Sequence, residues 1–197
     1  DGAMHFKRDL PVVAESDVLV CGAGCAGLGA AIAAGRLGAK TMIVERTGYA
    51  GGYLTNVTGA ALDGFVDLRT GLPIVGGIAF ELAQLAAGAP SDVAHGRYPP
   101  SNDLRELRET PDRIPIRFNL ELLKRHGDRL MQEAGVKILY HTHVADVMRE
   151  GEQVSGVVVV NKGGLGVIKA KMVVDCTGDA DVAAWAGAPF AINAEMH

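Results

Sequence analysis

The sequence predicts an α/β fold in which a central parallel sheet is combined with an antiparallel β-meander. Two apolar runs with β-branched residues, 18–21 and 40–45, flank an Ala- and Leu-rich segment, which is the pattern of a β–α–β unit. Between 144 and 169, three short strand-like segments are separated by breaks that contain glycine, as in consecutive hairpins. A further apolar run, 172–175, indicates that the chain then returns to the parallel sheet.

In the first half of the chain, the residue composition and the positions of glycine indicate the expected elements. Residues 25–37 favour a helix, and Gly38 stands where such a helix would stop. Residues 47–77 are rich in glycine and predict no regular element. The expected elements here are, in order, a strand at 18–21, a helix at 25–37, a strand at 40–45, a helix at 78–87 and a loop at 88–102.

In the second half, Asn119 is suited to cap a helix that runs to about Ala134 and is closed by Gly135. The apolar residues of this segment recur at helical spacing. The remaining expected elements are strands at 136–140, 144–149, 153–161, 166–169 and 172–175, followed by a helix at 179–186.

Composition excludes several classes of function. The 197 residues carry a formal net charge of −4, which gives no electrostatic reason to expect nucleic acid or an anionic membrane as a partner. No apolar run approaches the roughly 18 residues that a membrane-spanning helix needs. The three cysteines fit a reducing compartment better than a disulfide framework, so the expected location is cytoplasmic.

A glycine pattern, Gly22-x-Gly24-x-x-Gly27, lies between the first strand and the first helix. In such a turn the first glycine permits the sharp bend, the second lets a diphosphate approach bare backbone, and the third lets helix and strand pack closely. The helix N-terminus offers N–H groups and a positive dipole end to the anion. Glu45 ends the next strand, where an acid can bind ribose hydroxyls. We therefore expect a dinucleotide, the alternative being a glycine-rich turn that holds no nucleotide.

The spacing of the later strands bears on which dinucleotide is bound. A simple nicotinamide-binding domain continues promptly into its third strand, whereas here well over a hundred residues, including a meander, precede "VVDCTGDADVAAWAGAPF". Together with "VERTGYAGGYLT" and the first glycine motif, this segment resembles the FAD-dependent oxidoreductases of the glutathione-reductase-like flavoprotein superfamily. The resemblance implies a Rossmann-like FAD-binding domain, and it covers nearly all of 15–190.

The resemblance also implies the cofactor-binding residues. The first glycine motif and the helix start would line the FAD diphosphate, the acid after the second strand would hold the adenosine ribose, and a second glycine pair would bring the following residues towards the flavin. One valine would contact the adenine through its backbone, and the turn after the last strand would pass the cofactor again. These residues are Gly22, Gly24, Cys25, Ala26, Gly27, Glu45, Arg46, Gly51, Gly52, Leu54, Thr55, Val144, Thr177, Gly178 and Asp179.

On this basis the chain divides into an N-terminal extension, 1–14, and an FAD-binding domain, 15–197. The extension begins with DGAM, which we interpret as an expression remnant. Within the domain, 15–60 is the dinucleotide-binding β–α–β unit and 61–115 is a loop-rich insertion suited to a substrate or cap region. Residues 116–197 supply the helix, the meander and the second strand and turn at the cofactor.

Cysteines and histidines offer further candidates. Cys25 lies at a helix start, which would lower a thiol pKa, although a small residue chosen to fit beside phosphates explains it more simply. Cys21 and Cys176 end apolar strands and are expected in the core. His141 and His143 would share a face if their strand continued through them, giving either two metal ligands or an ordinary polar strand end; we expect no metal.

Other polar residues are candidates for acid–base chemistry or substrate binding. Asp179 and Asp181 are acids near a helix start, where the helix dipole favours them without any catalytic role. His126 is expected to be solvated. Several polar residues of the insertion suit a substrate site, since loops on a rigid scaffold commonly hold substrates, but none is assigned a catalytic role: Asp63, Asp67, Arg69, His95, Arg97 and Tyr98.

The expected function is flavin-mediated hydride or electron transfer on a small molecule. The alternatives are a non-catalytic FAD- or NAD-binding module of a larger assembly and an NAD-dependent dehydrogenase. Relatives of this kind continue beyond "GAPF", so we expect the 197 residues to lack a C-terminal part of the fold. We therefore expect either a portion of a larger flavoprotein or a chain whose flavin pocket a second chain completes.

Overall fold

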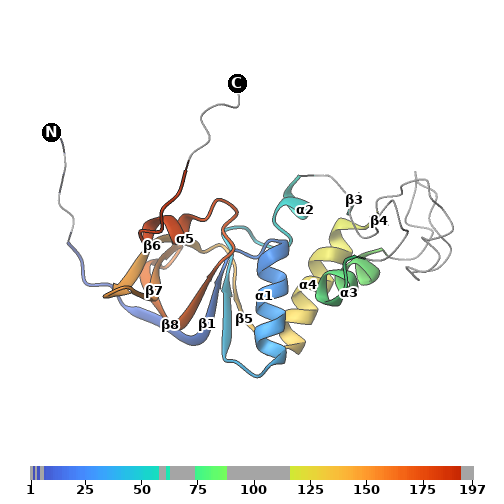
Figure 1. Ribbon diagram of the computed structural model, residues 1–197, viewed down its shortest axis with the longest axis horizontal. Coiled ribbons are helices and arrows are strands. Elements are labelled where there is room, and N and C mark those ends of the chain that lie inside the picture. The colour runs from blue at the N-terminus through green and yellow to red at the C-terminus, as the bar shows by residue number, and fades with distance from the viewer. Residues whose placement is uncertain are drawn as a thin grey trace.

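A six-stranded sheet is the framework of the protein (Figure 1). The computed structural model describes residues 2, 4, 7–57, 61–62, 74–87 and 116–191. The strands of the sheet follow the order β5-β2-β1-β8-β7-β6, and a separate two-stranded sheet joins β3 to β4. These strands are β1 Val12–Cys21, β2 Thr41–Val44, β3 Ala61–Leu62, β4 Ile116–Arg117, β5 Lys137–Leu139, β6 His143–Glu150, β7 Gln153–Asn161 and β8 Gly164–Asp175.

The sheet combines the two predicted halves. β5, β2, β1 and β8 are parallel neighbours, whereas β6, β7 and β8 pair antiparallel. The mixed α/β fold with a parallel sheet and a meander is therefore confirmed. Because the carboxyl ends of the parallel strands meet at one edge, the loops that follow β1, β2 and β8 lie together.

The separate strands expected at 166–169 and 172–175 are wrong, since both belong to β8. Its first part pairs with β7 through Lys169, and its residues Val167–Asp175 pair with β1. The pair Ala170–Lys171 interrupts the apolar pattern, but the backbone continues because β1 supplies hydrogen-bond partners on the side opposite β7. One strand thus connects the meander to the parallel sheet.

The first strand is also longer than expected. β1 starts at Val12 rather than at 18, because Val12 and Ala14 already pair with Val167 and Ile168 of β8. The domain boundary expected at residue 15 therefore falls inside this strand. Its exposed, partly polar first half concealed it from an apolar pattern.

The helices mostly match the predicted segments: α1 Cys25–Arg36, α2 Tyr53–Asn56, α3 Gly77–Ala86, α4 Leu120–Glu133 and α5 Asp181–Trp185. Asn119 caps α4 as expected, since its side-chain oxygen accepts from the backbone N–H groups of Glu121 and Leu122. α2 lies in the glycine-rich segment for which no element was predicted. α5 begins two residues later than expected, after Ala180, which has a left-handed φ of 59°.

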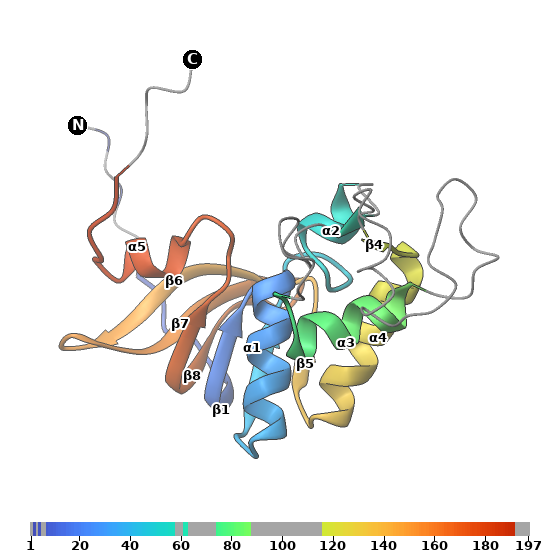
Figure 2. The ribbon, with the colours of Figure 1, turned by 45° about the vertical axis from the view of Figure 1, so that its right-hand side comes forward.

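Two apolar clusters cover the faces of the sheet. Helices α1, α3 and α4 pack on one side (Figures 1 and 2), around buried residues that include Val20 and Ile43. On the other face, Leu19 and Val44 pack with residues of the meander and with Val182 of α5. Adjacent residues of β1 therefore serve opposite faces, as the period of two in a strand requires.

His126 of α4 is partly buried rather than solvated as expected. Its Nδ1 atom is buried and has no hydrogen-bond partner within the described structure. Burial, reinforced by the nearby Arg129 and Arg125, lowers the pKa of this imidazole below its usual value.

No helix of the described residues is long and apolar enough to cross a membrane.

Candidate functional site

A cavity of about 540 Å³ opens at the carboxyl ends of β1, β2 and β8. Its size falls in the usual range for small-molecule sites, roughly 300–1,000 Å³. Eleven of the fifteen residues predicted to bind a cofactor line it: Gly22, Gly24, Cys25, Ala26, Glu45, Arg46, Gly52, Val144, Thr177, Gly178 and Asp179. The other four, Gly27, Gly51, Leu54 and Thr55, do not line it.

Two glycines of the first motif are required by the protein itself. Gly22 has a left-handed φ of 101°, and a Cβ there would lie 2.3 Å from the carbonyl oxygen of Cys176. A Cβ on Gly27 would lie 1.8 Å from the carbonyl oxygen of Gly22. These two positions therefore pack β1, α1 and the segment after β8 against one another, as the predicted roles of the first and third glycine require.

Gly24 is different, because nothing in the protein requires a glycine there. Its φ and ψ of −71° and −170° are open to any residue, and the nearest heavy atom to a Cβ would be the Gly52 Cα at 3.9 Å. The residue lines the cavity at the start of α1. The space in front of it is thus available to a ligand that contacts bare backbone.

The first turn of α1 is suited to an anion. No side chain caps it and it contains no acidic residue. The helix α4, in contrast, has both the Asn119 cap and Glu121 in its first turn. Cys25 and Ala26 of the uncapped turn line the cavity, so their backbone N–H groups and the positive end of the helix dipole lie at its wall.

Glu45 is fixed at the end of β2. Its residue is 7% exposed, and its two carboxylate oxygens accept from the backbone N–H groups of Ala23 and Thr47, each at 2.8 Å. Each carboxylate oxygen has a second lone pair, so the group can still accept from a ligand hydroxyl. The arrangement orients one acidic acceptor beside the glycine loop.

The segment that follows Arg46 folds back onto that loop. The N–H of Gly51 donates to the carbonyl of Ala23 at 2.8 Å, and a Cβ on Gly52 would lie 2.7 Å from Gly24 Cα. Thr55 is buried, its hydroxyl donating to the carbonyl of Ala50, and Leu54 packs against the helical core. These two residues support α2 instead of lining the cavity.

The turn after β8 is held by Asp175. One carboxylate oxygen accepts from the N–H and the hydroxyl of Thr177, and the other accepts from the N–H of Ala183 in α5. The Thr177 hydroxyl in turn accepts from the N–H of Asp181. This network presents Thr177, Gly178 and Asp179 along one wall of the cavity.

Sequence reasoning missed several residues that line the cavity. Two come from α2 and a third directly follows it, at the spacing i, i+3, i+4, which could have indicated a common face once a helix was assigned there. Val44 ends β2 and Cys176 directly follows β8, positions typical of ligand sites in parallel sheets. The missed residues are Val44, Tyr53, Asn56, Val57, Thr142, His143, Cys176 and Asp181.

The cysteines are not activated. Burial raises the pKa of Cys21 to about 12, and Cys21 lies in the core as expected. Cys176 is partly buried and packs against the core cluster, as expected, and it also lines the cavity. Cys25 is an exposed residue, yet packing around its sulfur raises the thiol pKa, which opposes the lowering expected at a helix start.

The two histidines do not share a strand face. β6 begins only at His143, whereas His141 adopts a left-handed φ of 51° and donates its N–H to the carbonyl of Thr47. Among the described residues, no group of three or more His, Cys, Asp or Glu could hold a metal. Asp63, Asp67, Arg69, His95, Arg97 and Tyr98 of the insertion lie outside the described residues.

Comparisons with known proteins agree with this geometry. The chain matches the family model "FAD dependent oxidoreductase" over residues 17–197. The search of curated proteins returned no match to the sequence.

Solved structures share the fold at low identity. A geranylgeranyl bacteriochlorophyll reductase-like protein from Thermoplasma acidophilum is 19% identical, with a TM-score of 0.60 over 90% of this chain and 44% of that one. L-proline dehydrogenase from P. horikoshii is 17% identical, with a TM-score of 0.57 over 93% and 58%. THI4 from Thermovibrio ammonificans is 20% identical, with a TM-score of 0.55 over 87% and 61%. The chain thus spans 44–61% of the length of these three structures.

Proposed function

Since the chain belongs to the FAD dependent oxidoreductase family, we propose that its cavity holds the adenosine and diphosphate part of FAD in an enzyme that oxidises or reduces a small molecule. FAD is the cofactor of the family, and the bound flavin supplies the transfer of a hydride or of electrons. The work of this chain is to bind and orient that cofactor.

The observation that carries the proposal is Gly24. A bare backbone position with no structural need for glycine lies at an uncapped helix N-terminus and lines a cavity. A diphosphate explains all three properties, because it needs close approach to the backbone, N–H donors and a positive dipole end. The residues present therefore fit FAD.

The other contacts follow from the same placement. Backbone N–H groups of Cys25 and Ala26 donate to the diphosphate, and the Glu45 carboxylate accepts from the adenosine ribose. Arg46 lies beside the ribose, and the backbone of Val144 contacts the adenine. The turn formed by Thr177, Gly178 and Asp179 and the loop at Gly52 complete the walls.

Several features extend the proposal beyond the described cavity. The chain spans about half the length of the similar structures, so a further region or a second chain is proposed to complete the flavin end.

All three cysteines are free, which supports a reducing, cytoplasmic compartment.

Titration of the purified chain with FAD tests the proposal, using flavin fluorescence and the absorption band at about 450 nm as readouts. NAD is titrated in parallel. We expect saturable binding of FAD with a lower Kd than that of NAD, since both ligands carry the adenosine diphosphate part and only FAD carries the flavin. The opposite preference would overturn the proposal in favour of a nicotinamide enzyme. Anaerobic addition of trial reductants then distinguishes an enzyme, in which the band bleaches, from a passive FAD-binding module.

A further inference from the structure

The helix α2 and the residue that follows it contribute three residues to the lining of the cavity. Tyr53, Asn56 and Val57 line it together, since they are spaced by three and four residues. Tyr53 and Val57 are exposed at 72% and 49%. Of these three, Asn56 is the residue that carries an amide, a group with both a hydrogen-bond acceptor and two donors.

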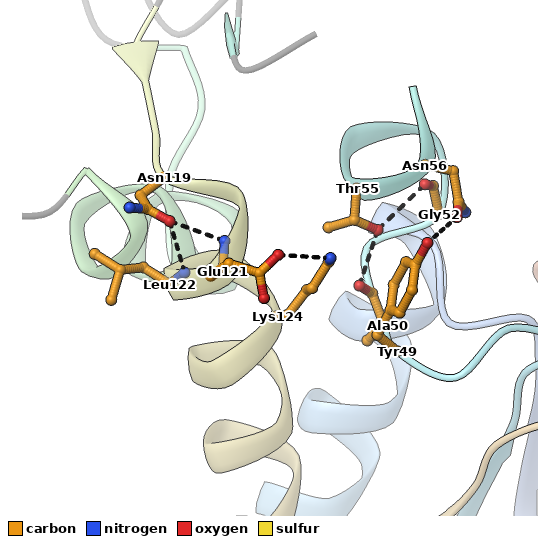
Figure 3. A network of polar contacts seen from close by, with 9 residues as sticks. All are labelled: Tyr49, Ala50, Gly52, Thr55, Asn56, Asn119, Glu121, Leu122 and Lys124. Atoms are coloured by element: carbon orange, nitrogen blue, oxygen red, sulfur yellow. Dashed lines mark hydrogen bonds and ion pairs between the residues drawn. The ribbon is translucent and has the colours of Figure 1, made fainter. Parts of the chain in front are cut away.

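The amide of Asn56 is held by Tyr49. The Tyr49 hydroxyl donates to Asn56 Oδ1 at 2.9 Å (Figure 3). An asparagine amide has an acceptor oxygen and an NH₂ group with two donors. Because the oxygen is used by Tyr49, the orientation of the amide is set and its NH₂ group has no described protein partner. A ligand that offers acceptors can therefore meet a preoriented donor.

Tyr49 is itself supported by α4. The Lys124 ammonium lies 4.0 Å from the centroid of the Tyr49 ring, and it also pairs with Glu121 Oε1 at 2.8 Å (Figure 3). Both contacts come from the first turns of α4, next to the Asn119 cap. A cation over a ring face favours one ring position. Lys124 thus holds the tyrosine from one face of its ring.

A second tie holds the same segment. The Tyr140 hydroxyl donates to Asp128 of α4 and also contacts the backbone of Ala50, the residue after Tyr49. Burial and the Asp128 carboxylate raise the pKa of Tyr140 well above its usual value, so its hydroxyl remains a donor. The segment that carries Tyr49 is therefore anchored to α4 at two points.

The place of α2 indicates which part of the ligand Asn56 meets. A Cβ on Gly52, directly before α2, would lie 2.7 Å from Gly24 Cα, so α2 starts beside the proposed diphosphate site. Asn56 ends this single turn and lines the same cavity. A diphosphate at neutral pH is rich in acceptors, and hydrogen bonds to charged groups are stronger than neutral ones.

We propose that the Asn56 amide NH₂ donates a hydrogen bond to the FAD diphosphate and that Tyr49 is a positioning residue that acts through Asn56. This inference rests on the proposed function. It adds a ligand residue and its support to a site otherwise built from backbone groups. Lys124 and Glu121 hold Tyr49 and do not touch the cofactor.

The test is titration of the chain and its variants with FAD and with ADP, which carries a diphosphate and no flavin. Asn56→Ala is expected to raise the Kd for both ligands about tenfold, through loss of one hydrogen bond to a charged group. Asn56→Asp is expected to raise both further, since a carboxylate repels the diphosphate. Tyr49→Phe, which removes only the hydroxyl, is expected to raise both about threefold.

A double-mutant cycle separates positioning from general damage. If Tyr49 acts through Asn56, Tyr49→Phe has no further effect on the Kd once Asn56→Ala is present. Asn119→Ala is the matched control. It removes a side-chain hydrogen-bond acceptor at the N-terminal end of α4, the end that carries Lys124 and Glu121, and Asn119 does not line the cavity. It should lower thermal stability while leaving both Kd values within twofold of the parent chain.

The outcomes are distinct. An Asn56→Ala chain with unchanged affinity for FAD overturns this inference and leaves the proposed function intact. A loss confined to FAD, with ADP unaffected, overturns the assignment to the diphosphate. Additive effects in the cycle overturn the positioning role of Tyr49. A parent chain that binds neither ligand overturns both the inference and the proposed function.

Discussion

Replacing Gly24 by valine should separate cofactor binding from folding. The backbone at Gly24 is in an extended conformation that valine adopts readily, and a Cβ there has no neighbour closer than 3.9 Å. Loss of unfolded-chain entropy stabilises such a variant by about 0.4–1 kcal/mol. Loss of a favourable N-cap residue opposes this by a similar amount, about 1 kcal/mol. The free energy of unfolding without ligand should therefore change by no more than about 1 kcal/mol.

Binding should respond very differently. The valine side chain would occupy the space through which the diphosphate reaches the N–H groups of Cys25 and Ala26. Two hydrogen bonds to a charged group are worth about 1.5–3 kcal/mol each, so about 3–6 kcal/mol is lost. At about 1.4 kcal/mol per factor of ten, the Kd for FAD should rise roughly 100-fold to 10,000-fold.

Two matched variants complete the experiment. Gly29→Val places the same side chain on α1, where a Cβ has no heavy atom within 4 Å, and should leave FAD binding unchanged. Gly27→Ala should destabilise the apo protein by about 1–3 kcal/mol or more, since its Cβ would overlap the Gly22 carbonyl. Fluorescence titration measures the Kd and urea unfolding measures stability. A Gly24→Val chain that binds FAD within threefold of the parent would refute the assignment of this loop.

Two other substitutions test buried polar groups. Glu45→Gln keeps one acceptor oxygen, so its NH₂ must face one of the two backbone N–H groups that the carboxylate now satisfies. We expect the free energy of unfolding in urea to fall by about 1.5–3 kcal/mol and the Kd for FAD to rise about tenfold. Unchanged values would exclude both the structural role of Glu45 and its role in binding the ribose. His126 has a lowered pKa in the folded state, so the unfolded chain takes up its proton first and stability falls as the pH drops through the ordinary value near 6.5. His126→Gln should flatten that part of the stability profile measured by thermal unfolding, and an unaltered slope would contradict this assignment.

Local signals explain what the sequence predicted well. The Asn119 cap, the Gly135 stop with its φ of 73° and the apolar stripe between them define α4 without reference to the rest of the fold. The same is true of β7, whose observed bounds equal the predicted 153–161. In these segments each residue's preference agrees with the final structure.

Non-local pairing explains what it did not. The first half of β1 and the continuity of β8 depend on hydrogen bonds between segments more than a hundred residues apart. No continuous apolar pattern marks them, because Glu15 and Ser16 interrupt the run in β1 and the pair Ala170–Lys171 interrupts the run in β8. The sequence therefore underestimated both strands.

In the candidate site, too, some residues could be predicted from local spacing and others depend on contacts between distant segments. Spacing alone located Gly22, Gly24 and Gly27, but only the packing distinguishes the two glycines that the protein needs from the one that a ligand needs. Asn56 could not be found from a motif, since its position depends on the contact of Gly52 with Gly24 and on the support of Tyr49 by Lys124. Such contacts have no signature in a single sequence.

Because β8 is one continuous strand, the hairpin turn between β7 and β8 influences the position of the cavity wall. At one end, Gly164 with its φ of 97° and the Asn161 side chain, which accepts from the N–H of Gly163, set how β7 and β8 align. At the other end, roughly 35 Å along the strand, β8 continues into Thr177 and Gly178. A slip of one residue at the hairpin would exchange the faces of every β8 side chain and displace the turn that follows. The hairpin therefore helps to set the position of the cavity wall at the far end of β8, and its Asn161 side chain also donates to the hydroxyl of Thr142, which lines the cavity.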